Sequence, residues 1–260
     1  MKQEWLEIYS SLVKQIEPDY KRPLEVSRKV LCVSPHPDDC EIGAGGTIAR
    51  ATKSGVKVDL VVVTDGSKGT FNPHAREEEV ASTRRREQEE SAKVLGVENI
   101  YFLGVRDGEL TFNYDVLNKL ITIIRITRPD LVLTPDPYLP YEAHPDHYYT
   151  GRLVSAAVLF SGMPLFNKQD LEKGLTPHSP RFIGYYYTSR PNTIVDVSNY
   201  VEYKISALRK HRSQFENEDF LLFILKYMEL SGSKIGVKYA EEFKILPVKL
   251  LHITPFIEYL

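Results

Sequence analysis

The sequence predicts an α/β protein with a Rossmann-like, doubly wound and mostly parallel sheet, followed by a C-terminal α+β extension. Apolar, β-branched runs alternate with helical segments in four consecutive βα units, which is typical of parallel sheets with right-handed crossovers. The apolar runs are nearly continuous, as in strands buried on both faces. Polar motifs follow each run, so they are expected at the one sheet edge where such folds place their ligands.

The length of 260 residues fits one domain. No long polar linker divides the chain. We therefore predict a single domain over residues 1–260, with a core at about 29–216 and the C-terminal extension at about 217–260.

Composition excludes several classes of protein. The net charge of −2 provides no field that attracts nucleic acid or anionic membranes. The N-terminus lacks the apolar core of a signal peptide, and no apolar run is long enough to span a membrane. Two cysteines, Cys32 and Cys40, do not make a disulfide framework, and Cys40 is expected to be a packed thiol. These features predict a cytoplasmic protein.

Periodicity places the elements along the chain. Helices are expected where apolar residues recur at helical spacing: 5–16, from 42, 77–95, 114–127, 203–215 and 220–230. Strands are expected at the β-branched and aromatic runs: 29–34, 56–64, 99–103, 130–134, 182–188, 193–197 and 246–253. Gly96 ends the charged helix, and a proline-rich loop over 135–142 precedes a second polar cluster.

Two clusters contain the groups that a hydrolase with a single zinc ion needs. The first comprises His36, Asp38 and Asp39, and the second comprises His144, Asp146 and His147. A catalytic zinc takes three protein ligands and leaves one position open. His36, Asp39 and one histidine of the second cluster would complete that set. The spacing leaves open which histidine it is.

The remaining polar groups then have natural roles. Asp38 is a spare carboxylate beside the metal and is placed to take a proton from the attacking water. The other histidine would face the substrate. Asp146 would fix the tautomer of that histidine and favour its protonated form.

Each motif also has a simpler interpretation. His36 to Asp39 could form a turn with Asp39 capping the next helix. The glycines at 43–46 resemble a phosphate-binding turn, but no acidic residue lies at the ribose distance. Arg84 belongs either to a solvated helix face or to the site, and Asp107 precedes a glycine in what is commonly just a turn. Both clusters in one chain, each after a buried strand, favour the metal site.

The motifs resemble those of the PIG-L/LmbE family of zinc-dependent N-deacetylases. They are Ser34 to Asp39, Arg84-x-x-Glu87, Ala143 to His147, and a late segment from Val195 to Phe215. The resemblance covers about residues 29–216. Within the family, the N-terminal helix and Cys40 resemble the archaeal diacetylchitobiose deacetylases.

The resemblance implies one zinc per chain, held by His36, Asp39 and His147, with Asp38 as general base. It implies His144 as the histidine that faces the substrate. It also places Arg84 and Asp107 in the substrate pocket. The implied reaction removes the acetyl group from an amino sugar that contains N-acetylglucosamine, with diacetylchitobiose or N-acetylglucosamine first and glycosyl-malate or glycosyl-inositol conjugates second. A homo-oligomer is implied, which is a hexamer in the archaeal group.

Two rival functions stay open at this point. A metal-dependent phosphoesterase would commonly bridge two metal ions. A sugar-binding protein with a structural zinc would close the site with a fourth protein ligand.

Overall fold

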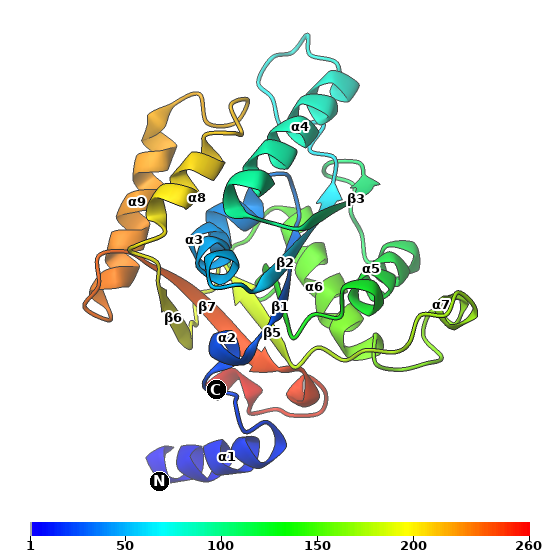
Figure 1. Ribbon diagram of the computed structural model, residues 1–260, viewed down its shortest axis with the longest axis vertical. Coiled ribbons are helices and arrows are strands. Elements are labelled where there is room, and N and C mark those ends of the chain that lie inside the picture. Colours follow the sequence, from blue (N-terminus) through cyan, green and yellow to red (C-terminus); the bar gives the residue numbers. More distant parts are fainter. Residues whose placement is uncertain (1) are drawn as a thin grey trace.

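The structure, a computed structural model, describes residues 2–260, so Met1 of the predicted range 1–260 lies outside it. Within these residues a seven-stranded sheet has the order β3-β2-β1-β4-β5-β7-β6 (Figure 1). Its strands are β1 Lys29–Ser34, β2 Lys57–Thr64, β3 Asn99–Val105, β4 Leu131–Pro135, β5 Phe182–Tyr186, β6 Thr193–Asp196 and β7 Ala240–Pro247. The predicted α/β class and mostly parallel sheet are confirmed.

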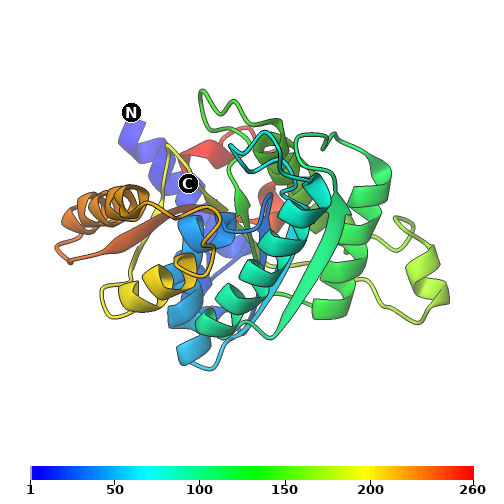
Figure 2. The same ribbon diagram turned by 90° about the horizontal axis from the view of Figure 1, so that it is seen from above.

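Helices cover both faces of the sheet (Figures 1 and 2). They are α1 Lys2–Ile16, α2 Pro23–Val26, α3 Asp39–Lys53, α4 Glu77–Leu95, α5 Tyr114–Thr127, α6 Pro145–Phe160, α7 Gln169–Glu172, α8 Val201–Leu208 and α9 Glu218–Ser233. Two 3₁₀ turns, η1 Val248–Leu250 and η2 Ile257–Tyr259, lie near the C-terminus. The predicted helices 77–95 and 114–127 have the observed bounds, whereas α8 ends at Leu208 instead of residue 215.

Side chains of β1 alternate between two apolar cores. Val30 and Cys32 pack in the core that α3, α8 and α9 cover, and Leu31 and Val33 pack in the core beneath α5 and α6. All four side chains are buried. The consecutive apolar residues of β1 are explained by this burial, because a strand covered by helices on both faces of the sheet must be apolar on both sides.

The order of the parallel strands reverses beside β1. Strand β1 pairs in parallel with β2 on one side and with β4 on the other, although β4 comes third after it in the chain. The connections that leave β1 and β4 therefore diverge to opposite faces and open a crevice at the carboxyl edge. Both polar clusters of the sequence follow these two strands.

The C-terminal segment enters the sheet. Strand β7 pairs antiparallel with both β5 and β6. The predicted strand over 246–253 is wrong, because β7 spans Ala240–Pro247 and is followed directly by η1. The charged residues Glu241, Glu242 and Lys244 concealed this strand in the sequence. All three are buried in the fold.

Cys32 and Cys40 form a disulfide, which corrects the prediction of a packed thiol. Cys32 lies in β1 and Cys40 lies in the first turn of α3, with their Cα atoms 6.4 Å apart. The bridge closes the loop that contains His36, Asp38 and Asp39.

No helix within residues 2–260 is both long enough and apolar enough to cross a membrane.

Candidate metal centre

The loop from β1 to α3 is held by its own hydrogen bonds. The Ser34 hydroxyl donates to the carbonyl oxygen of His36 at 2.6 Å and accepts from the Cys40 amide at 3.1 Å. The Asp39 carboxylate accepts from the His36 amide at 2.9 Å. Between them, Asp38 has a φ of 115°, in a region that few residues other than glycine adopt. Such strain is typical of functional sites.

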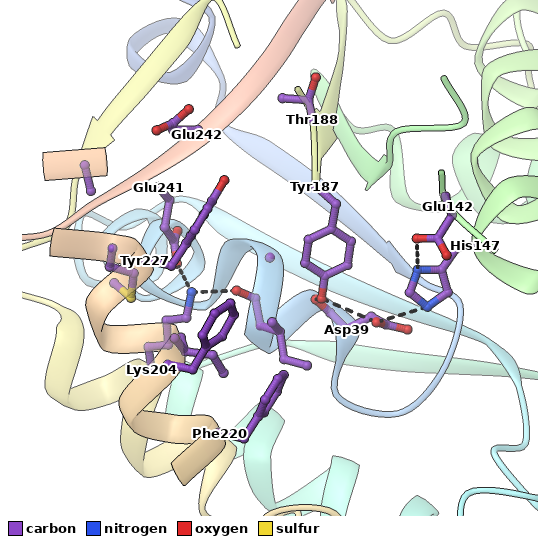
Figure 3. A pocket seen from close by; sticks show the side chains of 16 residues that line it. Asp39, Glu142, His147, Tyr187, Thr188, Lys204, Phe220, Tyr227, Glu241 and Glu242 are labelled. Carbon is purple, nitrogen blue, oxygen red and sulfur yellow. Dashed lines mark hydrogen bonds and ion pairs between the residues drawn. The ribbon is translucent and has the colours of Figure 1, made fainter. Parts of the chain in front are cut away.

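The second cluster opens α6. Pro145 occupies the first turn of this helix, where proline is favoured. His144 caps the helix, and its Nδ1 accepts from the Asp146 amide at 3.3 Å. His147 follows in the first turn and points toward Asp39 (Figure 3).

The three predicted ligands converge. Donor atoms of His36, Asp39 and His147 all lie within 4.8 Å of one another. The Asp39 carboxylate contacts His36 Nδ1 at 3.1 Å through Oδ2 and His147 Nε2 at 3.4 Å through Oδ1. Two imidazoles and one carboxylate are a donor set that zinc accepts, with a fourth position left for substrate or water.

Carboxylates lie behind both imidazoles. His36 Nε2 is 3.1 Å from Asp146 Oδ2 and 3.2 Å from Asp107 Oδ1, and His147 Nδ1 is 3.3 Å from Glu142 Oε2. Histidines that bind metals commonly direct their second ring nitrogen at such a group, which fixes the tautomer and the ring orientation. This arrangement fits His36 Nδ1 and His147 Nε2 as the metal-facing atoms.

His36 also belongs to a second cluster of possible donors, with Asp107, His144 and Asp146. The carboxylates there are already occupied. Asp146 accepts from the amides of Gly108 at 2.7 Å and Leu110 at 3.1 Å, and Asp107 accepts from the Lys68 amide at 3.1 Å. Asp39 likewise accepts from a backbone amide, that of His36, so both clusters are possible ion sites and the cluster of His36, Asp39 and His147 is the one that contains the predicted ligands.

Asp146 contacts both His36 and His144. Its carboxylate contacts His36, and only its amide contacts His144. That amide donates to His144 Nδ1, so the proton of a neutral His144 lies on Nε2. Burial lowers the pKa of His144, and the neighbouring His36 and His147 lower it further. The charge of Asp146 acts in the opposite direction and raises the pKa of His144, so the predicted role of Asp146 toward this histidine stays a prediction.

Asp38 lies beside this donor set and is buried. Burial raises the pKa of Asp38 to about 6, although the charge of Arg84 opposes that shift. The Asp38 amide donates to Gln88 Oε1 at 3.1 Å. Gln88 lies one helical turn after Arg84, so both residues face the same side of α4. Gln88 could not be identified from the sequence, because nothing there shows that this side of the helix faces Asp38.

Arg84 supports Asp38 from α4. Its Nη2 donates to the Asp38 carboxylate at 3.2 Å and to the Pro37 carbonyl at 2.7 Å, and its Nη1 donates to the Gly66 carbonyl at 3.1 Å. Gly66 has a φ of 64°, and a Cβ there would lie 2.7 Å from Nη1. Arg84 is only 4% exposed, so it belongs to the site and not to a solvated helix face.

Known proteins resemble the whole chain. The family model of the PIG-L GlcNAc-PI de-N-acetylases matches residues 31–158. A diacetylchitobiose deacetylase of Thermococcus kodakarensis is 43% identical over an alignment of 256 positions that covers 96% of this chain and 95% of that protein. A solved structure is also similar, that of the N,N'-diacetylchitobiose deacetylase from Pyrococcus horikoshii complexed with its inhibitor MPG. It superposes with a TM-score of 0.92 and is 45% identical in sequence, and the match covers 98% of this chain and 97% of that one.

A more distant relative is the probable N-acetyl-α-D-glucosaminyl L-malate deacetylase 2 of Bacillus cereus. It is 32% identical over an alignment of 197 positions that covers 74% of this chain and 86% of that protein. Similarity that extends over nearly the full length, together with the family model over the segment that holds both clusters, confirms the resemblance predicted from the motifs. The chain belongs to the PIG-L family of de-N-acetylases.

Proposed function

We propose that this protein is a zinc-dependent N-deacetylase that hydrolyses the acetamide of an N-acetylglucosamine unit, with diacetylchitobiose as the first candidate substrate. The observation that carries the proposal is the convergence of His36, Asp39 and His147 next to Asp38, whose carboxylate is paired with Arg84 and is not needed as a ligand. The names of the Thermococcus and Pyrococcus relatives support the choice of substrate.

In this proposal, His36, Asp39 and His147 would hold one zinc ion. When bound, zinc supplies positive charge beside the reacting carbonyl. The carboxylates of Asp146 and Asp107 at His36, and that of Glu142 at His147, would keep the two imidazoles in the tautomers that leave the metal-facing nitrogens free.

Asp38 would act as the general base. It takes a proton from the attacking water, whose oxygen forms a bond to the acetyl carbon. His144 donates from Nε2 to the oxyanion, an interaction typically worth about 3–4 kcal/mol. The carbon–nitrogen bond then breaks, and Asp38 or His144 returns a proton to the leaving nitrogen. The products are acetate and a free amino sugar.

Arg84 and Asp107 would hold sugar hydroxyls or steady the pocket. Asp107 lies at the crevice, where its Oδ2 accepts from the Lys68 amide and its Oδ1 contacts His36, so any sugar hydroxyl would share these oxygens. Arg84 is tied to backbone carbonyls and would steady Asp38. A homo-oligomer, a hexamer by resemblance, and a cytoplasmic location stay predictions.

The Bacillus relative supports a second candidate, a glycosyl-malate conjugate, because the 32% identity extends over 74% of this chain and 86% of that protein. A panel of N-acetylglucosamine, diacetylchitobiose and N-acetylglucosaminyl malate, with the released amine as the readout, separates the candidates. A metal-dependent phosphoesterase would instead hold about two zinc ions per chain and release phosphate.

The decisive experiment changes Asp38 to Asn. General-base catalysis typically contributes about 10²–10⁴-fold, so turnover should fall by that factor while metal analysis still finds one zinc per chain. Asp136→Asn is the matched control, because Asp136 follows β4 at the same sheet edge and should leave turnover unchanged. An undiminished rate in Asp38→Asn would remove Asp38 from its role as base.

A further inference from the structure

A largely apolar groove of about 440 Å³ opens next to the candidate metal centre. One end is formed by Asp39 and His147, and the other by aromatic residues of α9 that include Phe220 and Tyr227 (Figure 3). Its volume falls within the usual range for small-molecule sites, about 300–1,000 Å³. The methyl group of an acetamide fills only a small part of it.

Tyr187 connects the two ends. Its hydroxyl donates to the Asp39 carbonyl oxygen at 3.2 Å, and its ring stacks on His147 with the planes 9° apart and the centroids 5.9 Å apart. In Figure 3 its ring stands between the metal-facing residues and those of α9. The groove therefore begins at the ligand atoms themselves.

Four polar residues of the site lie outside this groove. Asp38, Arg84, Asp107 and His144 are not part of its wall, whereas Asp39 and His147 are. A carbonyl carbon that reacts at the metal carries two substituents, the nitrogen with its sugar and the acyl carbon. If the sugar lies toward Asp107, the acyl chain must leave in another direction, and the apolar groove is available there.

The charged residues of the groove are already paired. Lys204 donates to Glu241 at 2.7 Å and to the Ile42 carbonyl at 2.6 Å, and Lys234 donates to Glu242 at 2.7 Å. These paired charges therefore offer few hydrogen bonds to the hydroxyl groups of a sugar, such as the second unit of diacetylchitobiose. The aromatic residues Phe220 and Phe223 stack on each other and are 47% and 63% exposed, which leaves apolar surface for a ligand.

We infer that this groove binds the acyl chain of the substrate, so that the protein hydrolyses N-acyl amino sugars with chains longer than acetyl. The inference rests on the proposed function and extends its substrate class to medium-chain amides. The same bonds change as in deacetylation: water adds to the acyl carbon, the carbon–nitrogen bond breaks, the nitrogen gains a proton, and a longer carboxylate leaves.

The test compares N-acetyl-, N-butanoyl- and N-hexanoylglucosamine. Each methylene buried in the groove is worth about 0.8 kcal/mol, so kcat/KM should rise by up to about fourfold per methylene. Cleavage of the N-hexanoyl substrate at less than one hundredth of the N-acetyl rate would overturn the inference and leave the proposed deacetylase intact. Failure on all three would instead count against the proposed function.

Two variants of α9 locate the effect. Phe223→Ser removes apolar surface from the groove and should lower the ratio of N-hexanoyl to N-acetyl kcat/KM by about tenfold. Leu222→Ser removes comparable surface from the neighbouring position, which is 55% exposed and outside the groove, and should leave the ratio unchanged. Equal ratios in both variants would exclude the groove as the acyl site.

A binding measurement avoids turnover altogether. Calorimetry on the Asp38→Asn protein should find N-hexanoylglucosamine bound more tightly than N-acetylglucosamine, and Phe223→Ser added to that variant should remove the difference. Equal affinities in the Asp38→Asn protein would contradict the inference even if both substrates were cleaved.

Discussion

Asp146 holds three segments of the chain together through one carboxylate. It is 0% exposed, and it accepts from the amides of Gly108 and Leu110 after β3 while its Oδ2 contacts His36 after β1. Asp146 itself lies at the start of α6, after β4. One buried side chain therefore fixes how the loops of three strands meet, which sets the position of the candidate ligand His36.

Asp146→Asn should weaken zinc binding. The amide is nearly isosteric but carries no charge, and loss of such a partner typically lowers metal affinity by about 10–100-fold. Competition with a chromophoric chelator measures the dissociation constant. Glu142→Gln is the comparison and should have a smaller effect, because Glu142 is only half-buried. An unchanged zinc affinity in Asp146→Asn would show that His36 does not depend on this contact.

His178 predicts a pH dependence of stability. Burial lowers its pKa from the ordinary 6.5, although its Nε2 donates to the Pro129 carbonyl at 2.8 Å, which acts in the opposite direction. The unfolded chain then binds the proton more readily, so this residue's contribution is complete above pH 6.5 and is lost as the pH falls toward the folded-state pKa. Urea unfolding from pH 7.5 to 5 should show the wild type losing stability relative to His178→Gln. A constant difference would contradict this.

The site residues divide into those the sequence could predict and those it could not. His36, Asp39 and His147 follow strands whose ends meet at one edge, so their convergence follows from topology. Gln88 contacts Asp38 from a helix that is distant in the chain, and Glu142 contacts the nearby His147 from an irregular loop, so neither belongs to a recognisable motif. The role of Gln88 depends on the tertiary packing that brings α4 to α3, and that of Glu142 depends on the conformation of the loop before α6.

At the scale of elements, α3 shares its backbone hydrogen bonds with β7. Glu241 accepts from the amides of Gly46 at 2.9 Å and Thr47 at 2.7 Å, and Lys204 of α8 donates to the Ile42 carbonyl. The buried ion pair of Lys204 and Glu241 thus bonds to backbone groups of α3 that would normally bond to one another within the helix. Glu241 can therefore be buried within β7, and Glu242 and Lys244 have partners of their own in Lys234 and the Glu258 carbonyl, which is why alternation of apolar residues did not predict this strand.

Lys204→Met should be strongly destabilising. It leaves the carboxylate of Glu241 buried without its cation, and such losses typically cost about 3–5 kcal/mol in the free energy of unfolding. Urea denaturation measures the change. Lys226→Met is the control, because Lys226 forms an exposed pair with Glu229, and exposed pairs contribute about 0–1 kcal/mol. Similar effects of the two variants would contradict this account of the pair.

The Cys32–Cys40 disulfide ties β1 to α3 across a sequence separation of eight residues. The entropy of closing so short a loop corresponds to about 2–3 kcal/mol of stabilisation. Cys40→Ser should lower the free energy of unfolding by that amount under oxidising conditions and by nothing under reducing ones. Thiol titration of the denatured, unreduced protein should find no free cysteine, and two titratable thiols would show that the bridge is not formed.

For the whole molecule, the C-terminal segment is part of the sheet. Strand β7 pairs with β5 along Phe182–Tyr185 and with β6 along Thr193–Asp196, so β6 joins the sheet through β7. The core and the extension that the sequence distinguishes are therefore continuous in hydrogen bonding. Pairing between strands so far apart in sequence is what local periodicity cannot predict.

A chain ending at residue 216 should fail to fold. It would lack α9 and β7, exposing the antiparallel edge of β5 and the apolar residues that α9 covers. Limited proteolysis and near-ultraviolet circular dichroism of the truncated protein measure the loss of fixed packing. A cooperative unfolding transition in the truncated protein would show that residues 29–216 are an independent unit.

The backbone conformation of Asp38 limits which amino acids can occupy this position. Its φ of 115° is tolerated mainly by glycine, which has no Cβ, and by asparagine and aspartate, whose short polar side chains can bond to the nearby backbone. Of these, only aspartate can accept a proton from water. The backbone conformation and the chemistry thus both favour aspartate at this position. An alanine variant would change the loop conformation as well as remove the carboxylate, so a loss of activity could not be assigned to either change alone.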